Sequence, residues 1–169
     1  MPTYTLINSV ALNSGSAASI TFSSIPSTYT DLHLLFSGRC DSGGAIGRTI
    51  LTTFNNDTAN YTYRLIELAG TSVSAASGST RNGGIVPGPV ATSGVFSNIS
   101  IYIPIYTSSS NKNYQADSVL ENNTTTVYNT PVSGLWSSSS AINAIKLETD
   151  NGSSFVQYST AYLYGISNA

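Results

Sequence analysis

Apolar and polar residues alternate along most of this chain. This is the pattern of β-strands with one buried face, because successive side chains of a strand point to opposite sides of the sheet. The clearest case is 99–103, where three isoleucines alternate with Ser100 and Tyr102. The same period recurs at 4–10, 18–22, 32–36, 50–54, 61–65, 114–120, 125–129, either 142–144 or 145–147, and 155–166. The pattern predicts nine or ten short strands.

No window shows an apolar stripe at helical spacing, and strand-favouring Thr, Tyr, Val and Ile are plentiful. Turn-forming residues separate the strands at intervals of ~8–12 residues. Asp150-Asn151-Gly152 contains the Asn-Gly pair that favours a type I′ hairpin. We therefore expect an all-β fold, a jelly-roll-like antiparallel β-sandwich, formed by a single domain over residues 1–169.

Two segments interrupt the alternation. Residues 69–94 are rich in Gly, Ser and Pro, and we expect a long loop there, with an irregular strand inside it left open. Such a loop and the N-terminal strand are candidates for reaching across to neighbouring subunits. Pro104 cannot donate a ladder hydrogen bond, so the strand that contains it is expected at a sheet edge or bulged at that point.

Charge is scarce in this chain. Asp, Glu, Lys and Arg make up 8% of the residues, against about 25% in typical soluble domains. Ser, Thr and Asn must hydrate the surface instead, and low charge favours association. The six basic residues are scattered and the net charge is −2, so nucleic-acid binding is not expected. This composition favours a structural or binding protein over an enzyme.

The chain carries one cysteine, Cys40, so no internal disulfide is expected and a buried thiol is the favoured interpretation. The N-terminal residues lack the pattern of a signal peptide, and no apolar run has the ~18 residues needed to cross a bilayer. We expect synthesis in a cytoplasm and no membrane partner.

Catalytic and metal-binding motifs are missing from the sequence. His33 is the only histidine and lies in mid-strand between leucines, where a strand residue facing solvent or an interface is expected rather than a base. One His and one Cys cannot form a zinc site. Asp57 is the best of several weak calcium candidates, but the Asn and Asp residues around it are already accounted for by a turn. Asp117 and Glu121 lie ~13 Å apart on one strand face, too far for a glycosidase pair. No catalytic residue, cofactor or metal is expected.

Aromatic residues are the strongest candidates for an interface. The chain has 11 Tyr, 5 Phe and 1 Trp, and Tyr and Trp suit surfaces that are partly apolar and partly polar. Tyr158, Tyr162 and Tyr164 would share one face of a regular strand, while Trp136 is expected to be buried or at an interface. The full set of interface candidates is Tyr4, Arg81, Trp136, Tyr158, Tyr162 and Tyr164. A platform for stacking sugars is the alternative role for the tyrosines.

Segments 96–106, 117–123 and 159–166 resemble small structural proteins of tailed bacteriophages, especially phages of aquatic bacteria and cyanobacteria. The resemblance runs from about Asp31 to the C-terminus, and the closing pattern Thr-x-x-Leu-Tyr-Gly-Ile is its most specific part. It implies a virion component assembled in the host cytoplasm, most simply a capsid decoration (cement) protein. It further implies a homotrimer that binds the major capsid protein, and no active-site residues. A tail or fibre module that recognises host surface glycans is the alternative.

Overall fold

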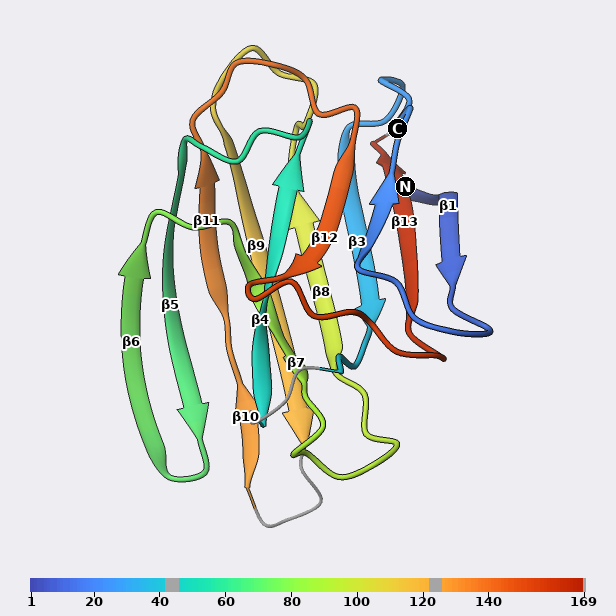
Figure 1. Cartoon of the computed structure of the whole chain (residues 1–169). Helices are drawn as coiled ribbons and strands as arrows, with labels where there is room; N and C mark the ends of the chain where they lie inside the picture. The colour runs from blue at the N-terminus through green and yellow to red at the C-terminus, as the bar shows by residue number, and fades with distance from the viewer. Residues whose placement is uncertain (42–45, 122–125, 169) are drawn as a thin grey trace.

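The computed structural model describes residues 1–41, 46–121 and 126–168 and shows two β-sheets packed face to face (Figure 1). The described residues form 13 strands and no helix. The larger sheet contains β1 (Thr3–Ala11), β3 (Asp31–Ser37), β5 (Tyr61–Ala69), β6 (Ser72–Gly78), β8 (Asn98–Ile103), β9 (Lys112–Glu121), β10 (Val127–Asn129), β11 (Val132–Trp136) and β13 (Thr160–Ser167). The smaller sheet contains β2 (Ser19–Phe22), β4 (Gly47–Phe54), β7 (Asn82–Pro87) and β12 (Ile145–Thr149).

Neighbouring strands are antiparallel throughout the described pairings. The larger sheet runs in the order β1-β13-β3-β8-β9-β10-β5-β11, with β6 paired to β5, and the smaller one runs β2-β12-β4-β7. The expected all-β antiparallel sandwich is therefore confirmed, whereas its jelly-roll connectivity stays a prediction.

The core lies between the two sheets and is built by the alternation seen in the sequence. In β9, every second residue from Tyr114 to Leu120 is buried. In β3 and β8, Leu32, Leu34, Ile99 and Ile101 are fully buried among other core residues. Removing an aliphatic side chain of this size from water contributes about 1.5–3 kcal/mol each. The core side chains thereby fix which residues of the larger sheet face outward.

The prediction of a long loop over residues 69–94 is wrong for much of this segment, because the segment contains β6 and β7. β7 is almost entirely buried and pairs with β4, so it cannot reach across to a neighbour. Deleting residues 72–86 would remove both β6 and nearly all of the core strand β7, and is therefore expected to disrupt the fold. β6, in contrast, is the exposed strand of this segment.

Two local expectations also need correction, and a third is resolved. β8 ends at Ile103, directly before Pro104, so the proline needs no edge or bulge and β8 lies between β3 and β9. Asp150 and Asn151 form a turn closed by a hydrogen bond from the Gly152 N–H to the Thr149 carbonyl, but no hairpin follows, because the next strand belongs to the other sheet. Of the two alternatives near residue 145, the strand is the later one, and the predicted strand residue Thr125 lies outside the described residues.

Candidate interaction surface

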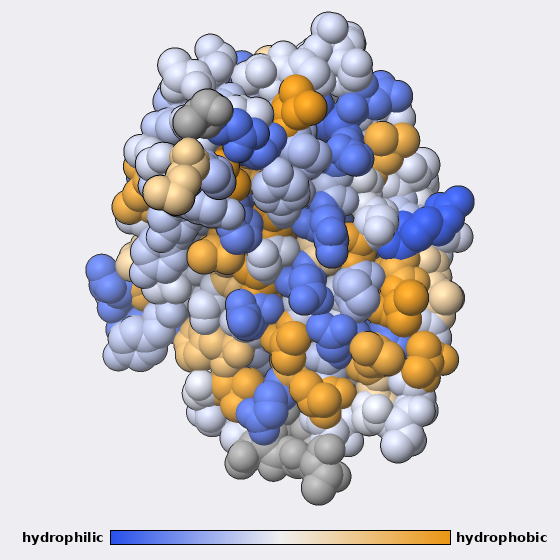
Figure 2. All heavy atoms as spheres, turned by 180° about the vertical axis from the view of Figure 1, so that it is seen from behind, coloured by the Kyte–Doolittle hydropathy of each residue, from blue (hydrophilic) through white to orange (hydrophobic). Residues whose placement is uncertain are grey.

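The outward face of β1, β13, β3 and β8 gathers five aromatic rings. We call this the tyrosine–histidine face and define it as Tyr4, His33, Tyr102, Tyr162 and Tyr164. Strand register explains the grouping, because Tyr164 pairs with His33 and His33 pairs with Tyr102 across three neighbouring strands. Residues directly opposite each other share one side of a sheet. Figure 2 views the molecule from this side.

Four of the five rings, those of Tyr4, His33, Tyr102 and Tyr164, contact one another edge to face. The ring centroids of Tyr4 and His33 are 5.9 Å apart, those of Tyr4 and Tyr164 6.3 Å, and those of His33 and Tyr102 6.4 Å. T-shaped arrangements at such distances are the favoured geometry of aromatic pairs. The rings remain accessible, since Tyr4 is 56% exposed and Tyr102 39% exposed. The surface is thus preformed, apolar in its ring faces and polar at the hydroxyl groups.

Hydrogen bonds hold two of these rings in place. His33 Nε2 and Ser100 Oγ are 2.7 Å apart and share a hydrogen bond. The Tyr102 hydroxyl donates to Asp31 Oδ2 over 2.8 Å, while the other oxygen of Asp31 accepts from the Ile105 N–H at 2.8 Å. Asp31 is itself buried at the start of β3. Its carboxylate therefore fixes the position of the Tyr102 ring.

The surroundings of His33 and Tyr102 keep these two rings neutral near pH 7. Burial lowers the pKa of His33, so its imidazole is uncharged at that pH. The hydrogen bond to Asp31, assisted by burial, raises the pKa of Tyr102 to about 12. A surface of neutral rings can be covered by a partner without the large cost of desolvating charges.

The raised pKa of Tyr102 predicts an alkaline effect on stability. The unfolded chain releases this proton near pH 10.0 and the folded protein only near pH 12. The folded state therefore binds more protons between these values, and its stability falls as pH rises through them. Tyr102→Phe should make that fall shallower in urea unfolding at several pH values. Tyr162→Phe, a change on the same face, is the control, and equal slopes for wild type and Tyr102→Phe would contradict the prediction.

The structure brings together three of the six predicted interface residues, Tyr4, Tyr162 and Tyr164. Tyr158 is 67% exposed but precedes β13, in a turn where its φ is 72°, so the predicted strip of three tyrosines on one strand is wrong at that residue. The interface residues predicted from the sequence do not include Tyr102, Asp31 or Ser100. They join the face only because β8 lies next to β3.

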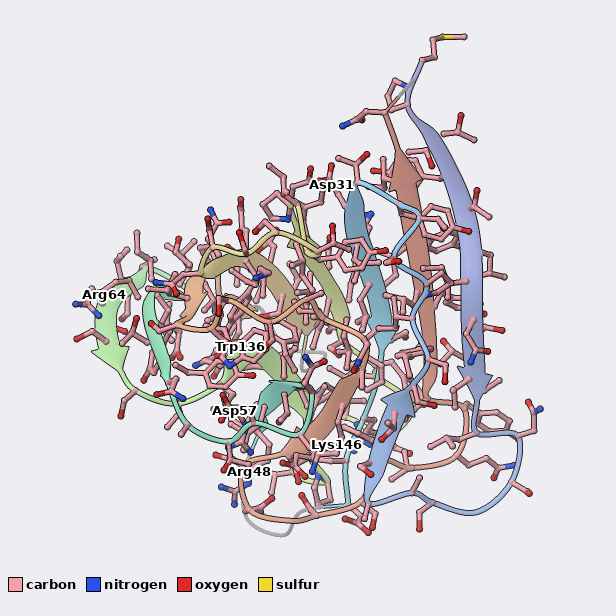
Figure 3. All side chains as sticks on the ribbon, turned by 90° about the horizontal axis from the view of Figure 1, so that it is seen from above. Asp31, Arg48, Asp57, Arg64, Trp136 and Lys146 are labelled. Carbon is pink, nitrogen blue, oxygen red and sulfur yellow. The ribbon has the colours of Figure 1, made fainter. Side chains whose placement is uncertain are left out.

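The remaining two candidates, Arg81 and Trp136, belong to a different cluster. Arg81 lies at the smaller sheet and forms an ion pair with Glu148 on β12 at 2.8 Å. Lys146 contacts the other oxygen of Glu148, also at 2.8 Å. Trp136 is 2% exposed and donates from Nε1 to Asp57 Oδ2 over 2.8 Å. Figure 3 shows Trp136 and Asp57 well apart from Asp31.

Hydrogen bonding explains why Asp57 sits in a turn. Its carboxylate accepts from the Trp136 indole and from the Ala59 N–H at 2.8 Å each, and these bonds lower its pKa. Both carboxylate oxygens of Asp57, the residue that the sequence left as the calcium candidate, therefore accept hydrogen bonds from within the fold. Among residues 1–41, 46–121 and 126–168, no three His, Cys, Asp or Glu side chains are grouped as metal ligands. The same residues contain no helix long and apolar enough to span a membrane.

Comparisons with known proteins identify no relative of this chain. A scan against protein-family models, a search of curated proteins and a search of solved structures each found no match to this chain. Functional inference therefore rests on the residues and their geometry.

Proposed function

We propose that this chain is a virion structural protein, a capsid decoration (cement) protein that stabilises a phage shell by docking across neighbouring capsid subunits. The observation that carries the proposal is the preformed tyrosine–histidine face on a protein with only 8% charged residues. Docking such a face buries rings and hydroxyl groups while leaving few ions to desolvate.

The wider outer surface has the same character. Figure 2 shows apolar residues interspersed with polar ones over this side of the larger sheet, and they gather toward its lower part. Exposed apolar side chains on the strands of this sheet include Leu6, Ile66, Leu68 and Val73. Extensive exposed apolar surface marks interaction sites on soluble proteins. Binding to a shell would also stabilise the folded chain, because only the folded form binds.

The function can be tested by adding purified protein to particles that lack it. Tyr162→Glu places a carboxylate on the tyrosine–histidine face, and its desolvation should lower occupancy of the shell about tenfold or more. Tyr158→Glu is the matched control, since it adds the same charge to an exposed tyrosine outside that face. Equal occupancy by both variants, or no binding of the wild type, would refute the proposed role. The proposal includes docking on the major capsid protein as a homotrimer, which is checked by the position of the protein in the particle.

One observation favours the alternative of a tail or fibre module that binds host surface glycans. A shallow pocket beside the tyrosine–histidine face is lined by Tyr102, Asn113, Gln115 and Ser133. An aromatic ring next to amide and hydroxyl groups suits a sugar, which offers both an apolar face and hydroxyl groups. Clear hits on a glycan array that are lost in Tyr102→Ala, together with few copies per particle, would favour this alternative.

A further inference from the structure

The free edges of the two sheets differ in how they are protected. An unpaired edge strand invites pairing with another chain, and proteins usually blunt it with charges, Pro, bulges or a short length. Among the described strands, β1 has a register shift between Leu6 and Asn8, β2 has only four residues, and β7 is buried and ends in Pro87. β6 has none of these protections. It spans 7 residues, Ser72–Gly78, contains no charge or proline, and is exposed at every position before Gly78.

The backbone hydrogen bonds of β5 show which backbone groups of β6 point to the free edge. The N–H groups of Ile66 and Gly70 donate away from β6, to the carbonyls of Pro131 and Val127. The alternate residues of β5, from Leu65 to Ala69, therefore turn their backbone groups toward β6. Their partners in register are Ala76, Ser74 and Ser72. The remaining residues, Val73, Ala75 and Ser77, direct their N–H and C=O groups to the free edge.

The sequence of β6 is suited to pairing with itself. In an antiparallel pair centred on Ala75, Ala75 faces its own copy, Val73 faces Ser77, and Ser74 faces Ala76. Every one of these side chains is small or of moderate size, and none carries a charge. Neither steric conflict nor like-charge repulsion opposes the close approach of two such strands.

We propose that the free edge of β6 is a homophilic interface, at which β6 of a second copy pairs antiparallel around a two-fold axis through Ala75. Three residues of each strand then form hydrogen-bonded pairs, giving about six main-chain hydrogen bonds. A typical interface has about 10 ± 5. The contact is isologous, as in most soluble dimers, and it joins two larger sheets into one.

Apolar side chains next to the edge support this arrangement. Ile66 pairs with Ala75, and Leu68 pairs with Val73, so these four share one side of the β5–β6 hairpin. Ile66 is 48% exposed and Val73 69% exposed. Across the two-fold axis, Ala75 of one copy would lie beside Ala75 of the other, with Ile66 of each copy on the far side of its own Ala75. The apolar strip becomes continuous over four strands, and water is excluded from its centre.

Cysteine cross-linking tests the register directly. In the proposed pair, the two copies of residue 75 have Cα atoms about 5.5 Å apart, within the range of a disulfide. The native Cys40 is buried, so Ala75→Cys introduces an exposed thiol on a protein that otherwise has none in its described surface. Under mild oxidation, Ala75→Cys should give about tenfold more covalent dimer on a denaturing gel than the control Ser74→Cys, whose copies lie too far apart to bridge. Equal dimer from both variants, or none from either, would overturn the proposal.

Charge substitution tests the energetics with two matched double variants. Val73→Glu with Ser77→Glu places like charges opposite each other across the axis, and should weaken association about tenfold or more. Val73→Lys with Ser77→Glu changes the same residues but places opposite charges together, and should associate as the wild type does. Sedimentation measures both. Wild-type protein without the two-fold contact, or equal association of both variants, would refute the interface. The interface is independent of the proposed function, since neither test uses a capsid.

Discussion

Replacing Trp136 with alanine is expected to lower the free energy of unfolding by about 3–5 kcal/mol, the range for large aromatic side chains removed from a core. Trp136 stacks on Tyr61 with ring centroids 6.3 Å apart and meets Phe54 edge-on at 5.7 Å. Phe54 also contacts the Tyr114 ring at 5.5 Å, so the cavity would open inside a cluster of rings that hold one another in place. Urea unfolding followed by circular dichroism measures the loss.

Trp136→Phe separates packing from hydrogen bonding. Phenylalanine keeps a ring in the cluster but removes the indole N–H that donates to Asp57. This variant should lose about 1–3 kcal/mol of unfolding free energy relative to wild type. That loss is smaller than the one expected for Trp136→Ala. The pKa of Asp57 should also rise toward its ordinary value, because the Trp136 hydrogen bond is the main cause of its depression. An unchanged Asp57 pKa in carboxylate NMR titration, or a loss below 1 kcal/mol for Trp136→Ala, would contradict the description of this cluster.

Gly134→Val is expected to destabilise the protein by about 3 kcal/mol, at the upper end of the cost of overpacking a core. Gly134 pairs with Tyr114 in the neighbouring strand, and a Cβ atom at residue 134 would lie 2.0 Å from that ring. The ring cannot simply turn aside. Its hydroxyl donates to the Asn82 carbonyl over 2.9 Å, and its edge meets Phe54.

The control for this prediction is Ser133→Val, the preceding residue of the same strand. Ser133 faces outward and is exposed, so valine there adds the same side chain without entering the Tyr114 ring. Its effect on stability should stay within about 0.5 kcal/mol, as for most surface substitutions. Similar thermal midpoints for the two variants would show that the Tyr114 ring does not require a glycine opposite it.

Strands with one buried face could be predicted from the sequence, because burial imposes a period of two on the side chains. β3, β8, β9 and most of β13 fall where alternation predicts them. β6 has no buried face, and β7 is buried on both faces, so neither shows that period. β7 also contains Gly83 and Gly84, where a Cβ atom would meet Thr52 at 2.1 Å and Ser118 at 2.8 Å. These glycines serve close packing, although from the sequence alone they suggest a loop.

The candidate surface could be predicted only in part for a related reason. The tyrosines of one strand share a face by local periodicity, which is visible in the sequence for Tyr162 and Tyr164. The contacts of His33 with Ser100 and of Asp31 with Tyr102 join residues 67 and 71 positions apart. Such contacts depend on which strands become neighbours, and that choice is made by the whole core rather than by any local pattern.

The position of β13 affects how the chain folds during translation. β13 lies between β1 and β3, and Thr3 pairs with Ser167, so β1 has no place in the sheet until residues 160–167 have left the ribosome. Contacts this distant along the chain close slowly. The nascent protein therefore holds an uncharged N-terminal segment without a partner during translation, a period in which a chaperone's protection would raise the yield of native molecules.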